Sequence, residues 1–299
     1  MTQEISDFFK MNDVKYRENF NLSLISPVRI GAQARFLAYP ESSEDLIKVV
    51  DFLRNKKIKH KILGRMSNVL PPDNIYNGVI VRTDLLSYQL VKGTTVEVGA
   101  GLSLPYLAKI TADAGLSGLE ELSGIPGSIG GAIRGNAGAF GREISQLVSR
   151  VTVYNRQSSR VEQLRSDQII FEYRRSGLIR DDVIILSAKL LLSRTDRATA
   201  NELIQKYREK RMATQPVGQA SLGSVFKRPA KDIYAAKLID ECGLKGRSVG
   251  GAKISEKHAG FIVNCGGATA ADYLTLADCA KDCVYKKFGV TLEREFDVI

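Results

Sequence analysis

The sequence predicts an α+β protein with at least two parts. Short segments of strand-like composition and amphipathic segments of helical spacing are mixed along its 299 residues, with few clear βαβ repeats. A Gln215-Pro216 step follows a long helical segment and marks a candidate domain boundary. Hydrophobic residues make up 44% and charged residues 25% of the chain, which is ordinary for a globular protein with sizeable cores.

The first half of the chain contains two well-marked helical segments. Residues 1–26 form a short helical or irregular lead. Ser42 or Ser43 can cap a helix that runs to about Lys57, because acidic residues come early, lysines come late and apolar residues recur at helical spacing. The second helix runs from about Ser103 to Ala114. The expected strands are 28–39, 59–63, 79–82, 88–91 and 94–98.

The second half continues the mixed pattern. Strands are expected near 147–155, 161–164 and 183–192, followed by a helix from about Ala198 to Arg211. Beyond Gln215-Pro216 the pattern predicts a small α/β unit. Its expected helices are 232–242 and 270–288, and its expected strands are 261–264 and 291–296.

The formal net charge of +10 points to anionic partners. Nucleic acid is one candidate, but the Lys and Arg residues are spread out and form no run of five or six. Large anionic small molecules would equally favour a basic cleft. No apolar run approaches the roughly 20 residues of a membrane span, and Met1 to Lys10 lacks the apolar stretch of a secretory signal. We expect a cytoplasmic protein with no membrane insertion and no nucleic-acid partner, and the sequence leaves its oligomeric state open.

Four cysteines lie in the last sixty residues, at Cys242, Cys265, Cys279 and Cys283. Zinc would need more ligands of the right spacing, because the chain has only two histidines and no C-x-x-C pair. Buried free thiols in a reducing compartment are the better interpretation. No metal site is expected.

The stretch Leu122 to Gly141 contains seven glycines in twenty residues. Such a run suits a place where backbone passes close to another group and where consecutive N–H groups face an anion. Ser128 and Asn136 add polar side chains there. The residues alone leave two readings open, a phosphate-bearing ligand or a plain glycine-rich turn, because the dinucleotide fingerprint and the P-loop lysine are both missing.

The spelling of this stretch resembles a known flavin loop. Residues 124–132 (GIPGSIGGA) and 136–141 (NAGAFG) are similar to the loop of the UDP-N-acetylenolpyruvoylglucosamine reductase family. Arg174 and Ser224 are close enough in sequence to match the short form of that family, without the insertion that bears a substrate-capping tyrosine. The resemblance implies non-covalent FAD held by Gly124, Ile125, Pro126, Gly127, Ser128, Gly130, Gly131, Asn136, Ala137 and Gly138.

A second segment resembles the family's pyrophosphate loop, Leu-Gly-x-Gly-Ser-Asn-Leu-Leu. Residues 63–70 read LGRMSNVL, which implies flavin contacts at Gly64, Arg65, Ser67 and Asn68. Met66 stands where the family has its second glycine, so a Cβ and a long side chain occupy the expected close approach. Pro71-Pro72-Asp73 departs from the apolar continuation of the family.

Two further motifs carry residues that the resemblance makes functional. Arg174, within 171–176 (FEYRRS), matches the arginine beside the flavin and the substrate carboxylate, a role that suits a planar guanidinium. Ser224, within 221–229 (SLGSVFKRP), matches the serine that protonates the intermediate. Lys227, Arg228 and His258 would contact substrate. Without the resemblance, a surface arginine, a turn-capping serine and a turn histidine remain open readings.

The last motif lies in residues 289–297. By resemblance to Leu-Glu-x-Glu-Val-Arg, its catalytic glutamate is Glu295. Glu293 and Glu295 would project to the same face of a strand, where one could orient or perturb the other. Phe296 and Asp297 replace the family's Val-Arg, which weakens any contact inferred for that arginine.

The resemblance runs from about Val28 to Phe296 and implies a fold and an activity. The implied fold is a two-lobed FAD-binding region of the vanillyl-alcohol-oxidase type over 1–210, with lobes of about 1–70 and 71–210. A small α/β substrate domain for the UDP-sugar follows over 211–299. The implied activity is NADPH-consuming, FAD-dependent reduction of UDP-N-acetylglucosamine enolpyruvate to UDP-N-acetylmuramate in peptidoglycan precursor synthesis.

Two alternatives stay open. Met66, Phe296 and Asp297 are compatible with a different or inactive flavin oxidoreductase of the same fold. The net charge is compatible with a basic nucleotide- or nucleic-acid-binding protein without enzymatic activity, which would hold no flavin and bind polynucleotide with steep salt dependence.

Overall fold

The computed structural model describes residues 2–180 and 182–299, which fall into two compact units. The first unit comprises residues 1–18, 36–65 and 78–209. The second comprises residues 19–35, 66–77 and 210–299, so it is assembled from three separate parts of the chain. Helices and strands are mixed in both units, which confirms the expected α+β class.

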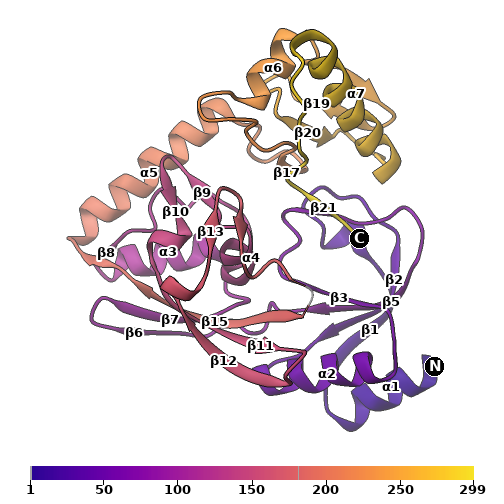
Figure 1. The fold of residues 1–299 in the computed structure, drawn as a ribbon, viewed down its shortest axis with the longest axis vertical. Helices are drawn as coiled ribbons and strands as arrows, with labels where there is room; N and C mark the ends of the chain where they lie inside the picture. The colour runs from indigo at the N-terminus through magenta and orange to yellow at the C-terminus, as the bar shows by residue number, and fades with distance from the viewer. Residues whose placement is uncertain (1, 181) are drawn as a thin grey trace. The chain divides into compact units, whose positions relative to one another are not determined.

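The first unit contains two sheets (Figure 1). One has the order β1-β2-β5-β3 and the other β12-β11-β15-β7-β6. Strands β3 and β5 are parallel, whereas the five-stranded sheet is antiparallel throughout. The strands are β1 (Lys15–Asn21), β2 (Gln33–Tyr39), β3 (His60–Leu63), β5 (Tyr76–Arg82), β6 (Gln89–Lys92), β7 (Thr95–Gly99), β11 (Val148–Asn155), β12 (Arg160–Arg165) and β15 (Val183–Leu191).

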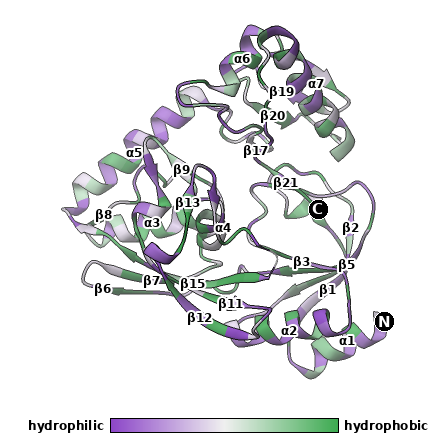
Figure 2. Ribbon diagram, viewed as in Figure 1, coloured by the Kyte–Doolittle hydropathy of each residue, from purple (hydrophilic) through white to green (hydrophobic). Residues whose placement is uncertain are grey.

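Helices cover the two sheets and enclose two apolar cores. Strand β15 is largely hydrophobic (Figure 2), whereas apolar and polar residues alternate along most of β11, and the buried residues of both strands pack with α3 and α4 in one core. Helices α1 and α2 pack with β2 and β5 in the other core. Tyr154 on β11 donates its hydroxyl to the Asp51 carboxylate on α2 at 2.7 Å. The helices are α1 (Thr2–Met11), α2 (Ser43–Asn55), α3 (Leu104–Asp113), α4 (Ile129–Arg134) and α5 (Arg197–Thr214).

Pairs of two-residue strands complete the first unit, and only the last two of the pairs that follow are hairpins. The pairs are β8 (Leu116–Ser117) with β16 (Ser193–Arg194), β9 (Gly138–Ala139) with β10 (Arg142–Glu143), and β13 (Phe171–Glu172) with β14 (Arg175–Ser176). Single 3₁₀ turns lie at Leu22–Leu24, Ile144–Gln146 and Ser166–Gln168.

The second unit has a four-stranded sheet of order β17-β20-β19-β18 with two helices packed on it. Tyr273, Leu276 and Val284 on α7 are fully buried in its core. Strand β21 pairs in parallel with β4, far away in the sequence. The elements are β4 (Val69–Leu70), β17 (Ser221–Ser224), α6 (Ala235–Glu241), β18 (Ser248–Val249), β19 (Ala252–Ile254), β20 (Phe261–Asn264), α7 (Ala270–Phe288) and β21 (Asp297–Val298).

Most of the expected helices and strands are confirmed, and three expectations are wrong. The lead contains a strand, β1, in addition to helix α1. The strand expected over 28–39 begins only at Gln33. Residues 291–296 form no strand, because Arg294 makes only an isolated bridge with Phe226 and the pairing of the last segment begins at Asp297. The four thiols are free, but Cys265 is exposed and the other three are half-buried rather than buried.

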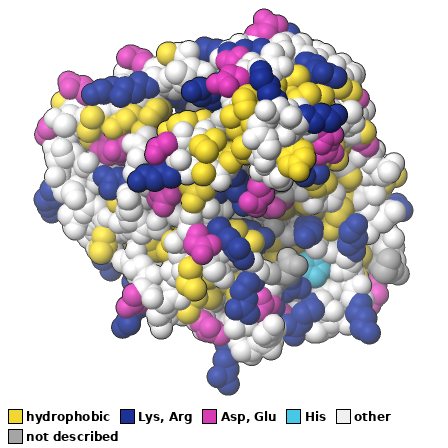
Figure 3. All heavy atoms as spheres, turned by 45° about the horizontal axis from the view of Figure 1, so that its top comes forward, with side chains coloured by type: hydrophobic (Ala, Val, Ile, Leu, Met, Phe, Trp, Pro, Cys, Tyr) yellow, Lys and Arg dark blue, Asp and Glu magenta, His cyan; other side chains and the backbone are white. Residues whose placement is uncertain are grey.

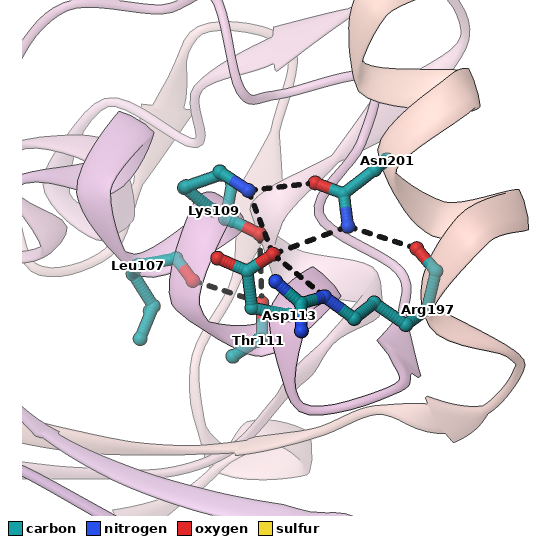
Figure 4. Close-up of polar contacts among 7 residues, drawn as sticks. Leu107, Lys109, Thr111, Asp113, Arg197 and Asn201 are labelled. Carbon is teal, nitrogen blue, oxygen red and sulfur yellow. Dashed lines mark hydrogen bonds and ion pairs between the residues drawn. The ribbon is translucent and has the colours of Figure 1, made fainter.

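Helix α5 is attached to α3 at its first turn (Figure 4). The carboxylate of Asp113 accepts from the Lys109 ammonium at 2.7 Å and from the Asn201 amide at 3.2 Å, and lies 3.4 Å from the Arg197 guanidinium. The Lys109 hydrogen bond is the largest of the contacts that hold the pKa of Asp113 below its usual value. Ala200 is the buried residue of α5, so this helix buries little apolar surface. The polar cluster around Asp113 therefore supplies much of its attachment to α3. No helix among residues 2–180 and 182–299 is long and apolar enough to cross a membrane.

Asp73 explains the departure of Pro71-Pro72-Asp73 from the expected apolar pattern. Its two carboxylate oxygens accept from the backbone N–H groups of Ala270 and Ala271, at 2.6 and 2.9 Å. These N–H groups belong to the first turn of α7, whose own cap is the Thr269 hydroxyl bonded to Asp272 N–H. A carboxylate at a helix N-terminus satisfies unpaired donors and complements the helix dipole.

We therefore expect Asp73→Ala to lower the stability of the protein by about 1 kcal/mol, the usual cost of losing a side-chain cap. The measurement is the midpoint of urea unfolding, monitored by circular dichroism. Asp282→Ala is the matched control, because it removes one carboxylate from the same helix far from its first turn. Equal shifts in the two variants would contradict the capping role.

Candidate functional site

The glycine-rich stretch forms a turn followed by the short helix α4. Ser128 is the N-cap of that helix, and its hydroxyl oxygen accepts from the Gly131 N–H at 3.3 Å. Gly130 donates its N–H to the Ala100 carbonyl at 2.8 Å. A Cβ at Gly130 would lie 3.0 Å from the Ala100 Cβ, so the packing against Ala100 favours glycine here.

The two segments expected to bind flavin meet at Gly64 and Ser128. A Cβ on Gly64 would lie 2.4 Å from the Ser128 Oγ, which is closer than real Cβ atoms approach. The turn after β3 and the N-cap of α4 therefore lie in contact, and only glycine fits at the first of them. Gly127 has a φ of +134°, a conformation that side-chain-bearing residues rarely adopt.

A third segment, which the sequence analysis did not single out, joins these two. Thr83 follows β5, and its N–H donates to the Leu63 carbonyl at 3.0 Å. A Cβ at Gly101 would lie 1.7 Å from the Thr83 carbonyl oxygen. The signal in the sequence is Gly99-Ala100-Gly101, whose two glycines precede the helix expected from about Ser103. Beside Thr83, Arg82 forms an ion pair with Asp84, and burial raises the pKa of the Asp84 carboxyl although Arg82 and Arg65 oppose the shift.

Arg174 lies against the end of the glycine-rich stretch. Its guanidinium donates to the Gly138 carbonyl at 2.8 Å, and its carbon lies 4.9 Å from the centre of the Tyr173 ring. Its φ of +55° is unusual for a residue with a side chain. The structure thus brings the predicted catalytic arginine together with residues predicted to hold the flavin.

Asn136 supports this arrangement from within the protein. It is fully buried, and its amide donates to the Glu143 carboxylate at 2.8 Å and to the Glu172 carbonyl at 3.0 Å. Its side-chain oxygen accepts from the Ser145 N–H at 3.3 Å. The Asn136 side chain therefore ties the glycine-rich stretch to the segment that carries Arg174. Ala137 follows it directly, and its N–H donates to the Ala132 carbonyl.

The second unit brings the other predicted functional residues into one cluster. Ser224 ends β17, opposite Phe261 on β20. The next residue, Val225, donates its N–H to the Gly260 carbonyl and accepts from the Glu295 N–H, both at 2.9 Å. Ser224 and Glu295 are both half-buried. A hydroxyl and a carboxylate from motifs far apart in the sequence are thereby placed on neighbouring segments.

Lys227 and Arg228 continue this cluster. The Lys227 N–H donates to the Glu293 carbonyl at 2.9 Å, and the Lys227 ammonium forms an ion pair with the Glu293 carboxylate at 2.6 Å. Arg228 lies over the Tyr234 ring at 5.8 Å. Glu293 was expected to share a strand face with Glu295, but no strand exists there, and Glu293 instead pairs with Lys227.

His258 lies in the turn before β20, whose first residue, Phe261, is opposite Ser224. Its ring nitrogen Nδ1 accepts from the Gly260 N–H at 3.2 Å, and its ring meets the Phe261 ring edge-on at 4.9 Å. Burial lowers the pKa of His258 below its usual value of 6.5, and the nearby Lys245 charge acts in the same direction. A neutral imidazole at neutral pH can accept as well as donate a hydrogen bond.

Ser67 and Asn68 belong to this second unit. The Asn68 amide donates to the Glu295 carbonyl at 2.8 Å, and the Asn68 carbonyl accepts from the Asp297 N–H at 3.0 Å. Met66, directly before them, has a φ of +56° and is almost fully buried. The chain thus adopts at Met66 the left-handed conformation for which the family uses glycine.

Basic side chains are interspersed with others on the face drawn in Figure 3. Lys and Arg side chains lie there among acidic and apolar ones, and on this face they form no continuous basic stripe of the kind that binds nucleic acid.

Comparison with known proteins identifies the family. A family model described as UDP-N-acetylenolpyruvoylglucosamine reductase, C-terminal domain, matches residues 215–299, and an FAD binding domain model matches residues 34–162. A UDP-N-acetylenolpyruvoylglucosamine reductase from Caldicellulosiruptor bescii is 38% identical over 99% of this chain and 94% of its own length. The chain belongs to the UDP-N-acetylenolpyruvoylglucosamine reductase family.

Further relatives agree with this membership. The reductase of Carboxydothermus hydrogenoformans is 39% identical over 97% of this chain and 99% of its own. The crystal structure of the Thermus caldophilus reductase superposes with a TM-score of 0.80 at 31% identity, covering 95% of this chain and 98% of that one. The predicted family and the predicted fold class, an FAD-binding region together with the family's C-terminal domain, are confirmed.

The residues present fit FAD. Close contact at Gly64 and Ser128 leaves no room for a side chain between the two expected flavin segments, which is what a backbone cradle for a phosphate-bearing cofactor requires. Which individual residues contact the cofactor stays a prediction.

Met66 provides the first test of the site. We expect Met66→Ala and Met66→Gly to be less stable than the natural protein, because both lose a buried side chain. Met66→Gly should be the more stable of the two by about 1 kcal/mol, since glycine relieves the left-handed strain. Leu70 is the control, buried but not left-handed. At that position, Leu70→Gly should be less stable than Leu70→Ala by roughly 0.5–1 kcal/mol. The same order at both positions would refute strain at Met66.

His258 provides a second test. Because its folded pKa lies below its unfolded value of 6.5, the unfolded chain takes up the proton first, and stability is lost as the pH falls below 6.5. His258→Gln should remove part of that loss, measured as the change of the urea midpoint with pH. His60, whose pKa is also lowered by burial, keeps its own share in this variant. An unchanged pH dependence would show that the pKa of His258 is not lowered in the folded protein.

Proposed function

We propose that this protein reduces UDP-N-acetylglucosamine enolpyruvate to UDP-N-acetylmuramate, using NADPH as electron donor and FAD as cofactor. The observation that carries the proposal is the pairing of the Glu295 segment with the Ser224 segment. The Glu295 N–H and the Val225 carbonyl are joined by a 2.9 Å hydrogen bond, so the residue with the carboxylate and the residue with the hydroxyl lie on neighbouring segments. Membership of a reductase family over the full length of the chain supports the same substrate and cofactor.

FAD supplies the hydride chemistry when it is bound. Ser224 donates a proton to the carbon next to the substrate carboxylate after hydride reaches the terminal carbon. A hydroxyl is a weak acid, but a carbanion beside a carboxylate is a strong enough base to take its proton. Lys227, three residues on, lowers the cost of the alkoxide that Ser224 becomes.

The remaining groups bind and orient the substrate. Arg174 pairs with the substrate carboxylate through its planar guanidinium and stabilises the enolate-like charge that develops there, and Glu295 helps to orient the reacting group. Arg228 and His258 contact the UDP-sugar. The Glu293 carboxylate neutralises Lys227 before an anionic substrate arrives. When substrate phosphate binds, Lys227 exchanges the Glu293 carboxylate for the phosphate.

We assign the FAD-binding role to residues 1–210 and the UDP-sugar role to residues 211–299. Residues 19–35 and 66–77, although early in the chain, belong to the compact unit that holds residues 210–299. The protein is proposed to act in the cytoplasm, where NADPH and nucleotide sugars are available.

A different reductase activity on the same fold is the second candidate. The departures at Met66, Phe296 and Asp297 favour it. Phe296 is buried against Tyr273, with ring centres 5.3 Å apart, so it serves the core rather than a ligand. NADPH consumption that depends on the enolpyruvyl UDP-sugar separates the first function from this one.

The test is the visible absorption of the FAD-loaded protein under anaerobic conditions. NADPH should bleach the flavin band, and the enolpyruvyl UDP-sugar should restore it. In Ser224→Ala, bleaching should proceed at an unchanged rate while restoration slows by at least about a hundredfold, the contribution of a positioned general acid.

Ser221→Ala is the matched control, because it removes a hydroxyl from the same strand at its other end. Restoration at the natural rate in Ser224→Ala would refute the role of that hydroxyl. If the enolpyruvyl UDP-sugar failed to restore the flavin band of the natural protein, the proposed substrate would be wrong.

A further inference from the structure

Asn68 lies in the segment expected to hold flavin, yet its side chain is bonded to the segment that carries Glu295. The amide nitrogen Nδ2 donates to the Glu295 carbonyl at 2.8 Å, across 227 positions of sequence. The Asn68 carbonyl accepts from the Asp297 N–H at 3.0 Å. One residue therefore makes two hydrogen bonds to the backbone on either side of Phe296.

The geometry extends a strand pairing by one step. Strands β4 and β21 are parallel, with Val69 opposite Asp297 and Leu70 opposite Val298. In a parallel ladder, donors and acceptors alternate evenly along each strand. The Glu295 carbonyl lies two residues before Asp297, where the next donor from the first strand is due, and the Asn68 side-chain amide supplies it. Asparagine is suited to this because its amide resembles a peptide group.

Glu295 is thereby fixed on both sides. Its N–H donates to the Val225 carbonyl at 2.9 Å, and its carbonyl accepts from Asn68. The residue itself belongs to no strand and is only half-buried, so ladder bonds and burial contribute little to its placement. Without the Asn68 amide, the Glu295 carbonyl would lose this protein partner, and the backbone at Glu295 would be held through its N–H but less tightly through its carbonyl.

We propose that Asn68 is a positioning residue for Glu295, with its side-chain amide holding the backbone from which the catalytic carboxylate projects. The inference rests on the proposed function of Glu295. It gives the 66–70 segment a second role: the same turn that is expected to approach the flavin sets the place of a carboxylate for the half-reaction with the enolpyruvyl substrate.

The proposal separates the two half-reactions. Asn68→Ala is compared with the natural protein at saturating FAD, because Asn68 is itself expected to contact the flavin, and the rate of bleaching by NADPH serves as the internal reference. Restoration of the flavin band by the enolpyruvyl UDP-sugar should slow by about tenfold, because loss of precise placement costs rate in the step that uses the group. Asn74→Ala is the matched control, since Asn74 is an exposed asparagine on the same segment.

A double-mutant cycle tests whether Asn68 acts through Glu295. If it does, adding Asn68→Ala to Glu295→Gln should cost less than about twofold in the restoration rate, although Asn68→Ala alone costs about tenfold. An equal tenfold loss in both backgrounds would overturn the proposal. A large loss of FAD affinity with an unchanged restoration rate would also overturn it, because Asn68 would then be a flavin ligand only.

A measurement that needs no turnover keeps the proposal distinct from the proposed function. Amide hydrogen exchange over residues 295–299 should be faster by about fivefold or more in Asn68→Ala than in Asn74→Ala, in the full chain loaded with FAD. If the natural protein failed to turn over the enolpyruvyl substrate, the proposed function would fall, while this exchange difference would still report the tether. Equal exchange in the two variants would show that the Asn68 side-chain amide does not restrain residues 295–299.

Discussion

The parallel pairing of residues 68–70 with residues 295–299 is the constraint on which the second unit depends. Two strands of two residues each hold little by themselves, because a short ladder provides few hydrogen bonds. Three side-chain contacts add to them. Asn68 binds the Glu295 carbonyl, Asp73 caps α7, and Asn264 donates to the Val28 and Arg29 carbonyls at 2.9 and 3.2 Å. Each joins an early segment of the chain to the C-terminal part, and each satisfies backbone groups that would otherwise need water.

This mode of assembly explains which features the sequence predicted. Helices α2 and α7 were predicted almost to the residue, because their apolar spacing and caps are local: Ser42 accepts from Asp45 N–H, and Gly289 ends α7 in the left-handed conformation. Strands β4 and β21 were missed for the opposite reason. Their pairing partner lies more than two hundred positions away, and two residues carry no periodic signal.

The candidate site likewise has features that the sequence predicted and features that it did not. The family resemblance implied flavin contacts for both glycine-bearing loops, and the contact of Gly64 with Ser128 agrees with that. The resemblance also implied roles for Ser224 and Glu295 in one reaction, and their segments are joined through Val225. It could not reveal that Glu293 pairs with Lys227, or that the side chain of Asn68 reaches Glu295, because such contacts depend on the path of the folded backbone. Met66 shows the limit most clearly. A residue that breaks the expected pattern still adopts the left-handed backbone of the glycine it replaces, with its side chain buried.

The central claim is that the turn at 66–70 and the segment at 295–299 behave as one piece of structure. Amide hydrogen exchange of the natural full-length protein, measured before and after saturation with FAD, tests this most directly. The account predicts that FAD slows exchange in both segments together, although only the first is expected to approach the cofactor. Protection of residues 64–70 alone, with unchanged exchange at 295–299, would contradict it.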